Sequence, residues 1–118
     1  MSVWEILSSC EGRIPRKTFW IAYLCLHLPL GIVGAIIDIA MGYEDPDSIG
    51  PGTIIYIAVS ILPTLAIFIK RLHDRDKSGW FLLLVLVPVV GSIWFFIETG
   101  LLRGTHGSNR YGEDPLAM

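Results

Sequence analysis

The sequence predicts an all-α membrane protein, a small bundle of three transmembrane helices with a short N-terminal interfacial helix as an additional element. Hydrophobic residues make up 53 % of the 118 residues, more than a water-soluble domain of this size accommodates. They form long runs separated by short charged segments, and Asp38 is the only charge inside a run. We therefore expect one membrane domain over residues 1–118, with spans at about 19–41, 53–69 and 80–97 and a turn-rich tail at 101–118.

The first eleven residues are not expected to form a signal peptide. The first long apolar run begins only at Phe19 and exceeds the length of a signal-peptide apolar region. Val3, Trp4 and Leu7 recur at helical spacing against polar neighbours. Two alternatives remain open for this segment, a short amphipathic helix in the membrane interface and a disordered terminus.

Basic residues indicate which loops stay in the cytoplasm. Arg13, Arg16 and Lys17 precede the first span, and four further Lys and Arg residues lie in the loop at 70–80. The loop at 42–52 contains three acidic residues and no Lys or Arg. Since positively charged short loops stay on the cytoplasmic side, we expect the N-terminus and the 70–80 loop inside and the 42–52 loop outside.

The third apolar run, residues 80–97, decides the side of the C-terminus. Three full crossings would leave the C-terminus outside, and this is the favoured topology, although Arg103 and Arg110 weigh against it. A break at residues 88–91, PVVG, would instead make the third span a re-entrant hairpin and return the tail to the cytoplasm.

Polar side chains recur on one face of the first two spans. In the first span His27 and Asp38 share a face with small residues, whereas the opposite face is aliphatic. Such a face serves either a polar pathway or inter-helix packing, and packing with a hydrogen-bonded His27 is the favoured interpretation. The candidate intramembrane polar seam consists of Tyr23, His27, Asp38, Ser60 and Thr64.

The 70–80 loop combines bases, acids, a histidine and a tryptophan, which is more chemistry than membrane orientation alone requires. We expect Asp74 to pair with Arg71, Arg75 or the arginines before the first span, Arg13 and Arg16, and to form a fixed cap. The candidate cytoplasmic interaction surface consists of Arg13, Arg16, Lys17, Arg71, His73, Asp74, Arg75, Lys77, Ser78 and Trp80.

Several classes of site are not expected. Cys10 and Cys25 lie on different elements, so neither a disulfide framework nor a zinc site is indicated, and no cofactor is expected. His73 beside Asp74 is a weak signal for catalysis, because a general base also needs a positioned nucleophile, and we expect no enzyme. No basic patch with interleaved aromatics suggests nucleic acid.

Four motifs in a fixed order identify a family. They are GRIPRKTFW at 12–20, KRLHDRDKSGW at 70–80, PVVG at 88–91 and GTHGSNRYGEDP at 104–115. Together they resemble the small bacterial inner-membrane proteins classed as domain of unknown function 805, the YhaH and YhaI type. The resemblance implies a small polytopic protein of the bacterial inner membrane, and it supplies no enzymatic activity, substrate or cofactor.

Two functions from different classes follow. The first is an interaction or regulatory module that presents its basic cytoplasmic face to anionic membrane lipids or to a protein partner, since juxtamembrane bases attract anionic lipid. The alternative is a subunit of a small oligomeric transporter or channel that uses the polar seam, because ionisable groups within a membrane are functional candidates. The expected partners are membrane lipids, a second copy of the chain or another membrane protein.

Overall fold

The computed structural model describes residues 2–116 of the chain, and every regular element in this part is helical. This confirms the all-α fold class. The elements are α1 (Val3–Ser8), α2 (Arg16–Ala40), α3 (Pro51–Asp74), the 3-10 helix η1 (Gly79–Leu86), α4 (Val90–Phe96) and the π-helical turn η2 (Ile97–Leu101).

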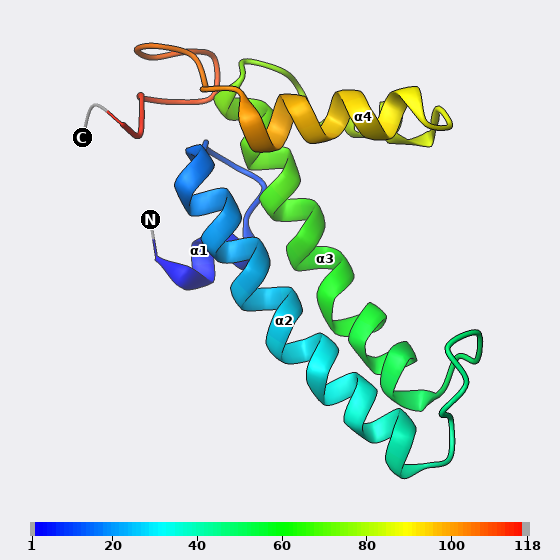
Figure 1. Ribbon diagram of the computed structural model, residues 1–118. Coiled ribbons are helices and arrows are strands. Elements are labelled where there is room, and N and C mark those ends of the chain that lie inside the picture. Colours follow the sequence, from blue (N-terminus) through cyan, green and yellow to red (C-terminus); the bar gives the residue numbers. More distant parts are fainter. Residues whose placement is uncertain (1, 117–118) are drawn as a thin grey trace.

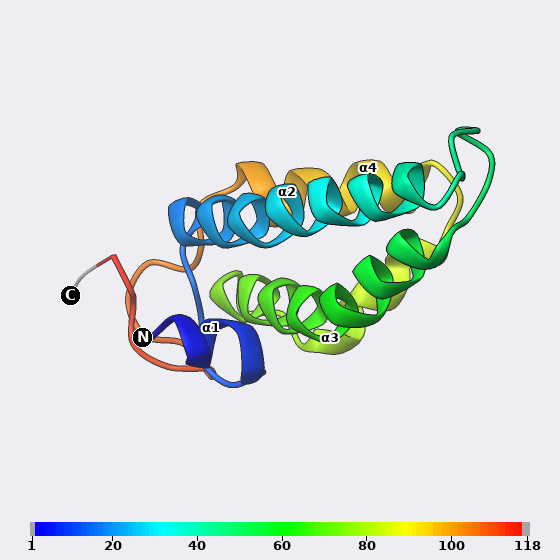
Figure 2. The same cartoon turned by 90° about the horizontal axis from the view of Figure 1, so that it is seen from below.

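Helices α2 and α3 lie side by side and run in opposite directions along most of the molecule (Figures 1 and 2). Two glycines allow close contact near the loop that joins them. A Cβ atom added to Gly52 would lie 2.0 Å from the carbonyl oxygen of Gly34, and one added to Gly34 would lie 2.8 Å from that of Gly52. Small residues are what allow helix backbones to approach this closely in a membrane.

Both long helices have the length and surface of membrane spans. They contain 25 and 24 residues, enough to cross a hydrocarbon core of about 30 Å. Only 6 % and 22 % of their most apolar 18-residue stretches are buried inside the protein. A core helix of a soluble protein would be mostly covered, so these exposed apolar faces indicate contact with lipid.

The third apolar segment is a hairpin, which corrects the expectation of a continuous helix over 80–97. Helices η1 and α4 pack against each other and are joined by a tight turn. Pro88 explains the break, because it cannot donate a backbone hydrogen bond and it excludes the helical conformation at Val87, whose φ and ψ are −74° and 117°. Val89 then reverses the chain with a positive φ of 63°.

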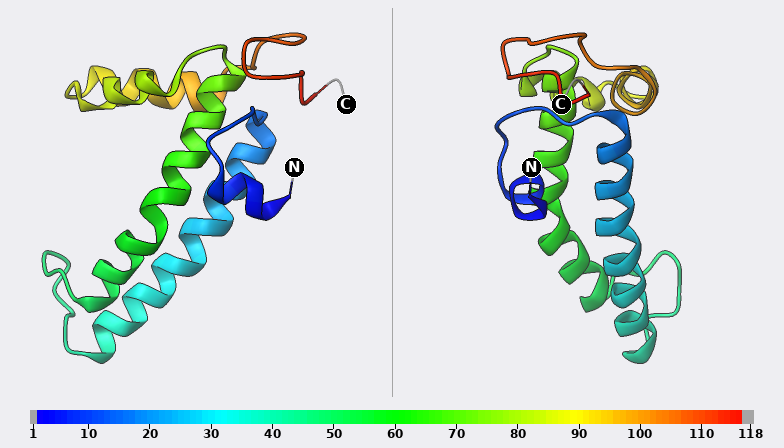
Figure 3. Two further views of the ribbon diagram at one scale, coloured as in Figure 1. Left: turned by 180° about the vertical axis from the view of Figure 1, so that it is seen from behind. Right: turned by 90° about the vertical axis from the view of Figure 1, so that its left-hand side faces the viewer.

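This hairpin lies across one end of the α2–α3 pair (Figures 1 and 3). Its two ends therefore meet at the start of α2 and the end of α3, together with the tail that follows η2. We call this region the polar end, and the opposite end, with the loop between α2 and α3, the acidic end. The arrangement agrees with the re-entrant alternative for the third segment and not with a tail on the far side.

The N-terminal segment forms the short helix α1, so the amphipathic-helix alternative holds. Ser2 and Glu5 form a reciprocal capping box, in which each side chain accepts a hydrogen bond from the other residue's backbone N–H. Ile6 and Leu7 pack against the buried core residues of the polar end, Ile14, Phe19 and Ile67. Val3 and Trp4 point outward and are 74 % and 76 % exposed.

Candidate functional site

Asp74 is the centre of the polar end. Its carboxylate accepts a hydrogen bond from Arg13 Nε at 2.9 Å and another from Arg71 Nη1, and the Arg13 and Asp74 side chains are each only 2 % exposed. Asp74 is the last residue of α3, where the helix dipole disfavours a negative charge. The two guanidinium groups therefore supply the compensation that this buried carboxylate requires.

Arg71 connects α3 to both neighbouring segments. Its side chain is completely buried, and its Nε donates to the carbonyl oxygen of Thr99 at 2.6 Å. Its remaining nitrogens donate to the carbonyl oxygen of Ile14 at 3.3 Å and to that of Leu102. One arginine thus fixes the segment before α2 and the end of the hairpin on the same helix.

Arg13 performs the corresponding task for the tail. Its guanidinium group donates to the carbonyl oxygens of Thr105 at 2.7 Å, Gly107 at 2.8 Å and Gly112 at 3.3 Å. Gly104 passes so close to Asp74 that an added Cβ atom would lie 2.0 Å from its Oδ2. Close approach to Asp74 therefore explains Gly104, whereas Gly107 and Gly112 adopt positive φ angles of 75° and 140° that favour glycine.

His73 holds the tail from a second direction. Its ring stacks on Tyr111 with centroids 3.9 Å apart and an interplanar angle of 1°. Its Nδ1 lies 2.9 Å from the carbonyl oxygen of Gly12, and its own carbonyl accepts a hydrogen bond from Asn109 Nδ2 at 2.9 Å. These contacts give His73 a structural role, because they hold the tail and the segment before α2 against the end of α3.

Arg75 does not pair with Asp74, which corrects part of the expected cap. It donates instead to Glu98 at 2.8 Å, and Lys77 Nζ lies 2.8 Å from the same carboxylate oxygen. Burial raises the pKa of Glu98, but the hydrogen bonds and charges of Lys77 and Arg75 outweigh it and leave the pKa below its ordinary value. Glu98 therefore stays ionised and ties the hairpin to the 70–80 loop.

The tail also stabilises its own fold through Asp114. The backbone N–H groups of Gly107 and Leu116 each donate to this carboxylate at 3.0 Å. These two hydrogen bonds, helped by the charge of Arg103 at 3.8 Å, hold the pKa of Asp114 below its ordinary value.

The ten residues expected as one exposed surface divide into groups, which corrects that expectation. Arg13, Arg71, His73 and Asp74 are buried, Arg75, Lys77 and Ser78 are partly exposed, and Arg16, Lys17 and Trp80 are exposed. Arg16 donates one hydrogen bond to the carbonyl oxygen of Leu101 at 2.7 Å. The buried group builds the polar end, and only the other residues are accessible to a partner.

The residues expected to form one intramembrane polar seam lie in two separate places. His27 lies between α2 and α3, with its Nδ1 2.6 Å from the Tyr56 hydroxyl and its Nε2 2.9 Å from the Thr64 hydroxyl. The Tyr23 ring lies against it, with centroids 4.4 Å apart. Ser60 is buried on α3 one turn away from Thr64. This cluster belongs to the middle of the helix pair.

Asp38 lies apart from that cluster, at the acidic end. Its carboxylate accepts hydrogen bonds from the backbone N–H groups of Gly52 at 2.6 Å and Thr53 at 3.1 Å, and from the Thr53 hydroxyl at 2.5 Å. It therefore caps the N-terminus of α3, where a negative charge is favoured.

Sequence reasoning missed Lys70. Its side chain is buried, and Nζ donates to the carbonyl oxygen of Glu5 at 2.7 Å and to that of Ile6. It thereby binds α1 to α3. The local pattern gave no signal for this contact, because a lysine at a membrane boundary equally well snorkels to water. Within residues 2–116 no group of three His, Cys, Asp or Glu residues is arranged to hold a metal ion.

Comparison with known proteins gives consistent matches. The family model described as "Protein of unknown function (DUF805)" matches residues 7–113. The chain is 35 % identical over 116 residues to the inner membrane protein YhaI of Escherichia coli K12, covering 98 % of this chain and 92 % of the relative. It is 35 % identical over 106 residues to the inner membrane protein YhaH of the same strain, covering 89 % and 85 %. No solved structure gives a significant match.

Proposed function

The chain belongs to the DUF805 family, and from this premise we propose that it is a non-enzymatic interaction module of the bacterial inner membrane that binds anionic lipid. In this proposal α2 and α3 cross the bilayer, the polar end faces the cytoplasm, and the acidic end faces outward. The observation that carries the proposal is the separation of charge between the two ends of the helix pair.

All nine Lys and Arg residues belong to segments that meet at the polar end. Nine basic and seven acidic side chains leave this end with a net charge of +2, whereas four acidic side chains leave the acidic end with −4. Basic segments near a span stay on the cytoplasmic side. The docked tail adds Arg103 and Arg110 to this side, which three full crossings would have placed outside.

Two of the basic residues are available to lipid. Arg16 and Lys17 are exposed at the start of α2, and neither forms an ion pair with another residue in the described part of the chain. A basic side chain near an anionic membrane surface contributes about 1 kcal/mol of attraction. Because their charges are not neutralised within the protein, these two residues are the best candidates for contact with phosphate groups.

The hairpin supports the same placement. Residues 78–97 contain no charged side chain, and apolar side chains on both of its helices are exposed, including Leu83, Leu86 and Val90 at 57 %, 75 % and 68 %. A protein partner would cover one face, whereas hydrocarbon covers an apolar element from every side. The hairpin therefore lies in the leaflet next to the polar end, with Trp80 at its base suited to the headgroup region.

The alternative of a transporter or channel subunit has no comparable support. Both ring nitrogens of His27 and both carboxylate oxygens of Asp38 already have partners within the protein. The two groups also belong to separate clusters, one in the middle of the helix pair and one at the acidic end, so they do not form a continuous polar path.

The proposal is tested by the lipids that remain bound after purification from membranes containing phosphatidylglycerol and phosphatidylethanolamine. Lys17→Gln, alone and with Arg16→Gln, should lower the retained phosphatidylglycerol. Arg110→Gln is the matched control, because its charge is already paired with Asp76 at 3.3 Å. Equal phosphatidylglycerol in the Lys17 variants and the control would reject lipid binding by these residues and favour a protein partner.

A further inference from the structure

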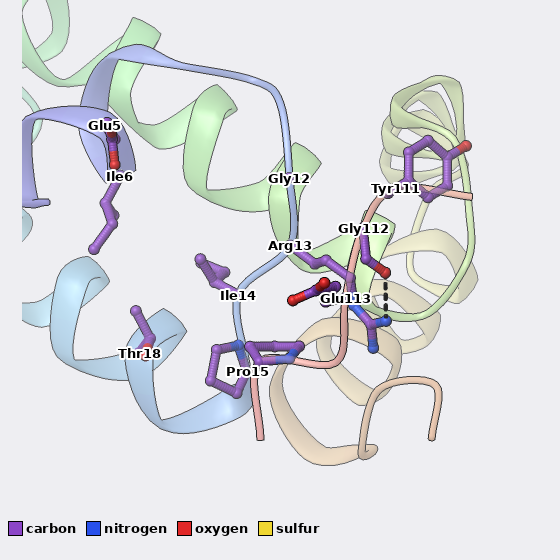
Figure 4. A pocket seen from close by; sticks show the side chains of 11 residues that line it. Glu5, Ile6, Gly12, Arg13, Ile14, Pro15, Thr18, Tyr111, Gly112 and Glu113 are labelled. Atoms are coloured by element: carbon purple, nitrogen blue, oxygen red, sulfur yellow. Dashed lines mark hydrogen bonds between the residues drawn. The ribbon is translucent and has the colours of Figure 1, made fainter. Parts of the chain in front are cut away.

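Two adjoining hollows flank α1. One, the polar hollow, has a volume of about 610 Å³ and is lined by α1, the segment before α2 and the tail (Figure 4). The other, the apolar groove, has a volume of about 480 Å³ and lies between α1 and α2. Ile6 and Thr18 line both, so the two hollows meet at these residues. A polar cavity that continues into an apolar groove is suited to an amphiphile.

The groove matches one leaflet in length. It follows α2 from Thr18 to Leu30, and the twelve helical steps between these residues extend over about 18 Å at about 1.5 Å per residue. One half of a hydrocarbon core is about 15 Å thick. The lining is almost wholly apolar and includes Ala22, Cys25 and Pro29. An acyl chain that starts at the polar end therefore fits along the groove.

The walls of the groove are held in place before any ligand binds. Lys70 Nζ donates to backbone carbonyls of Glu5 and Ile6, which fixes α1 against α3. Ile6 and Leu7 pack against the buried core of the polar end. A preformed cavity loses little conformational entropy on binding.

The polar hollow favours a cationic group. Glu5 and Glu113 lie on different sides of it, and both side chains belong to exposed residues. Neither carboxylate forms an ion pair with a described residue. Arg13 is the only basic residue in the lining, and its guanidinium group is already bound to Asp74 and to three tail carbonyls. The accessible charge in the hollow is therefore negative.

We propose that the polar hollow and the apolar groove together bind one phospholipid whose headgroup carries a primary ammonium group. The ammonium donates a hydrogen bond to Glu113, Thr18 offers a hydroxyl at the junction where the phosphate lies, and one acyl chain occupies the groove. This site is distinct from Arg16 and Lys17, and it does not depend on which side of the membrane the polar end faces.

The test is native mass spectrometry of the whole protein released from bilayers with equal amounts of phosphatidylethanolamine, phosphatidylcholine and phosphatidylglycerol of identical acyl chains. We expect about tenfold more bound phosphatidylethanolamine than phosphatidylcholine, whose methylated nitrogen donates no hydrogen bond. This comparison uses the wild-type protein alone. Equal retention of these two lipids, or preferential retention of phosphatidylglycerol only, would overturn the proposed site.

Variants then locate the site. Glu113→Gln should abolish the preference for phosphatidylethanolamine, whereas Glu44→Gln in the loop at the acidic end should leave it unchanged. Ala22→Phe fills the groove and should reduce retention of every lipid at this site, with unchanged helical content by circular dichroism. A preference that survives Glu113→Gln, or full retention in Ala22→Phe, would show that the lipid binds elsewhere.

Discussion

The two ends of the helix pair are both closed by a buried carboxylate, but the contacts differ in range. Asp38 at the acidic end binds Gly52 and Thr53, which are 14 and 15 residues away. Asp74 at the polar end binds Arg13, which is 61 residues away and in turn reaches carbonyls up to 99 residues away. The acidic end is a local helix cap, whereas the polar end joins the segment before α2, the end of α3, the end of the hairpin and the tail. Changes at the polar end should therefore have the larger consequences.

The largest effect is expected for Asp74→Asn. It leaves the buried guanidinium groups of Arg13 and Arg71 without a counter-charge, and breaking a buried ion pair in this way costs about 3–5 kcal/mol of the free energy of unfolding. Thermal unfolding in detergent measures the loss. Asp76→Asn is the control, because its exposed pair with Arg110 contributes about 0–1 kcal/mol.

The same measurement shows whether Arg13 acts through Asp74. In a double-mutant cycle, Asp74→Asn and Arg13→Gln should be strongly non-additive, since residues in contact share an interaction that either change removes. Strictly additive losses would mean that Asp74 does not hold the N-terminal segment.

A smaller effect at the polar end is expected for Gly104→Ala. The new methyl group would lie 2.0 Å from Asp74 Oδ2 and 2.6 Å from its carbonyl oxygen, so the tail must move away, at a cost of about 1–3 kcal/mol. Trypsin should then cut at Arg110 faster than in the wild type. Ser108→Ala, in an exposed part of the tail, should not change the cutting rate, and an unchanged rate in both variants would contradict the docked tail.

Asp38→Ala tests the acidic end and should cost less than Asp74→Asn. It removes the cap of α3 but leaves no buried charge unpaired. The free energy of unfolding should therefore fall only by the contribution of one helix cap, and the polar end should stay intact. The comparison uses unfolding in detergent together with tryptic cutting at Arg110, which should stay slow. A loss as large as that of Asp74→Asn would remove the distinction between a local and a long-range end. Asp47→Ala, in the exposed loop, is the control.

The smallest effect is a pH dependence from Glu98. Its pKa is lowered in the folded protein, so the stability that it contributes is complete above the ordinary glutamate pKa of about 4.3 and disappears as the pH falls through the lower, folded value. Glu98→Gln should therefore flatten part of the decline in unfolding temperature on acidification. An identical acid profile in the variant would show that Arg75 and Lys77 do not stabilise the carboxylate.

Part of the polar end could be predicted from the sequence. Sequence reasoning identified two spans, placed Asp74 at the centre of the 70–80 loop and paired it with arginines before the first span, because opposite charges at one membrane face must come close. It paired Arg75 incorrectly, because its partner Glu98 follows the third apolar run. A single break at Pro88 returns Glu98 and the tail to the polar end, whereas an unbroken run places them on the opposite side.

The remaining contacts depend on backbone geometry that residue patterns do not record. Gly104 and Asn109 predict turns in the tail, but their contacts with Asp74 and His73 follow only from where the hairpin delivers the chain. Likewise, the position of Asp38 near the end of a span predicts only that its charge lies close to water. Its role as the cap of α3 depends on the path of the connecting loop, which the sequence pattern does not give.

The central claim is that the polar end gathers both ends of the chain on the cytoplasmic side. Single cysteines at Ser48 and Ser108, in a protein without Cys10 and Cys25, test it directly through labelling with a membrane-impermeant maleimide. We predict that Ser48→Cys is labelled in intact cells, whereas Ser108→Cys is labelled only after the inner membrane is permeabilised. Labelling of Ser108→Cys in intact cells would place the tail outside and contradict the account.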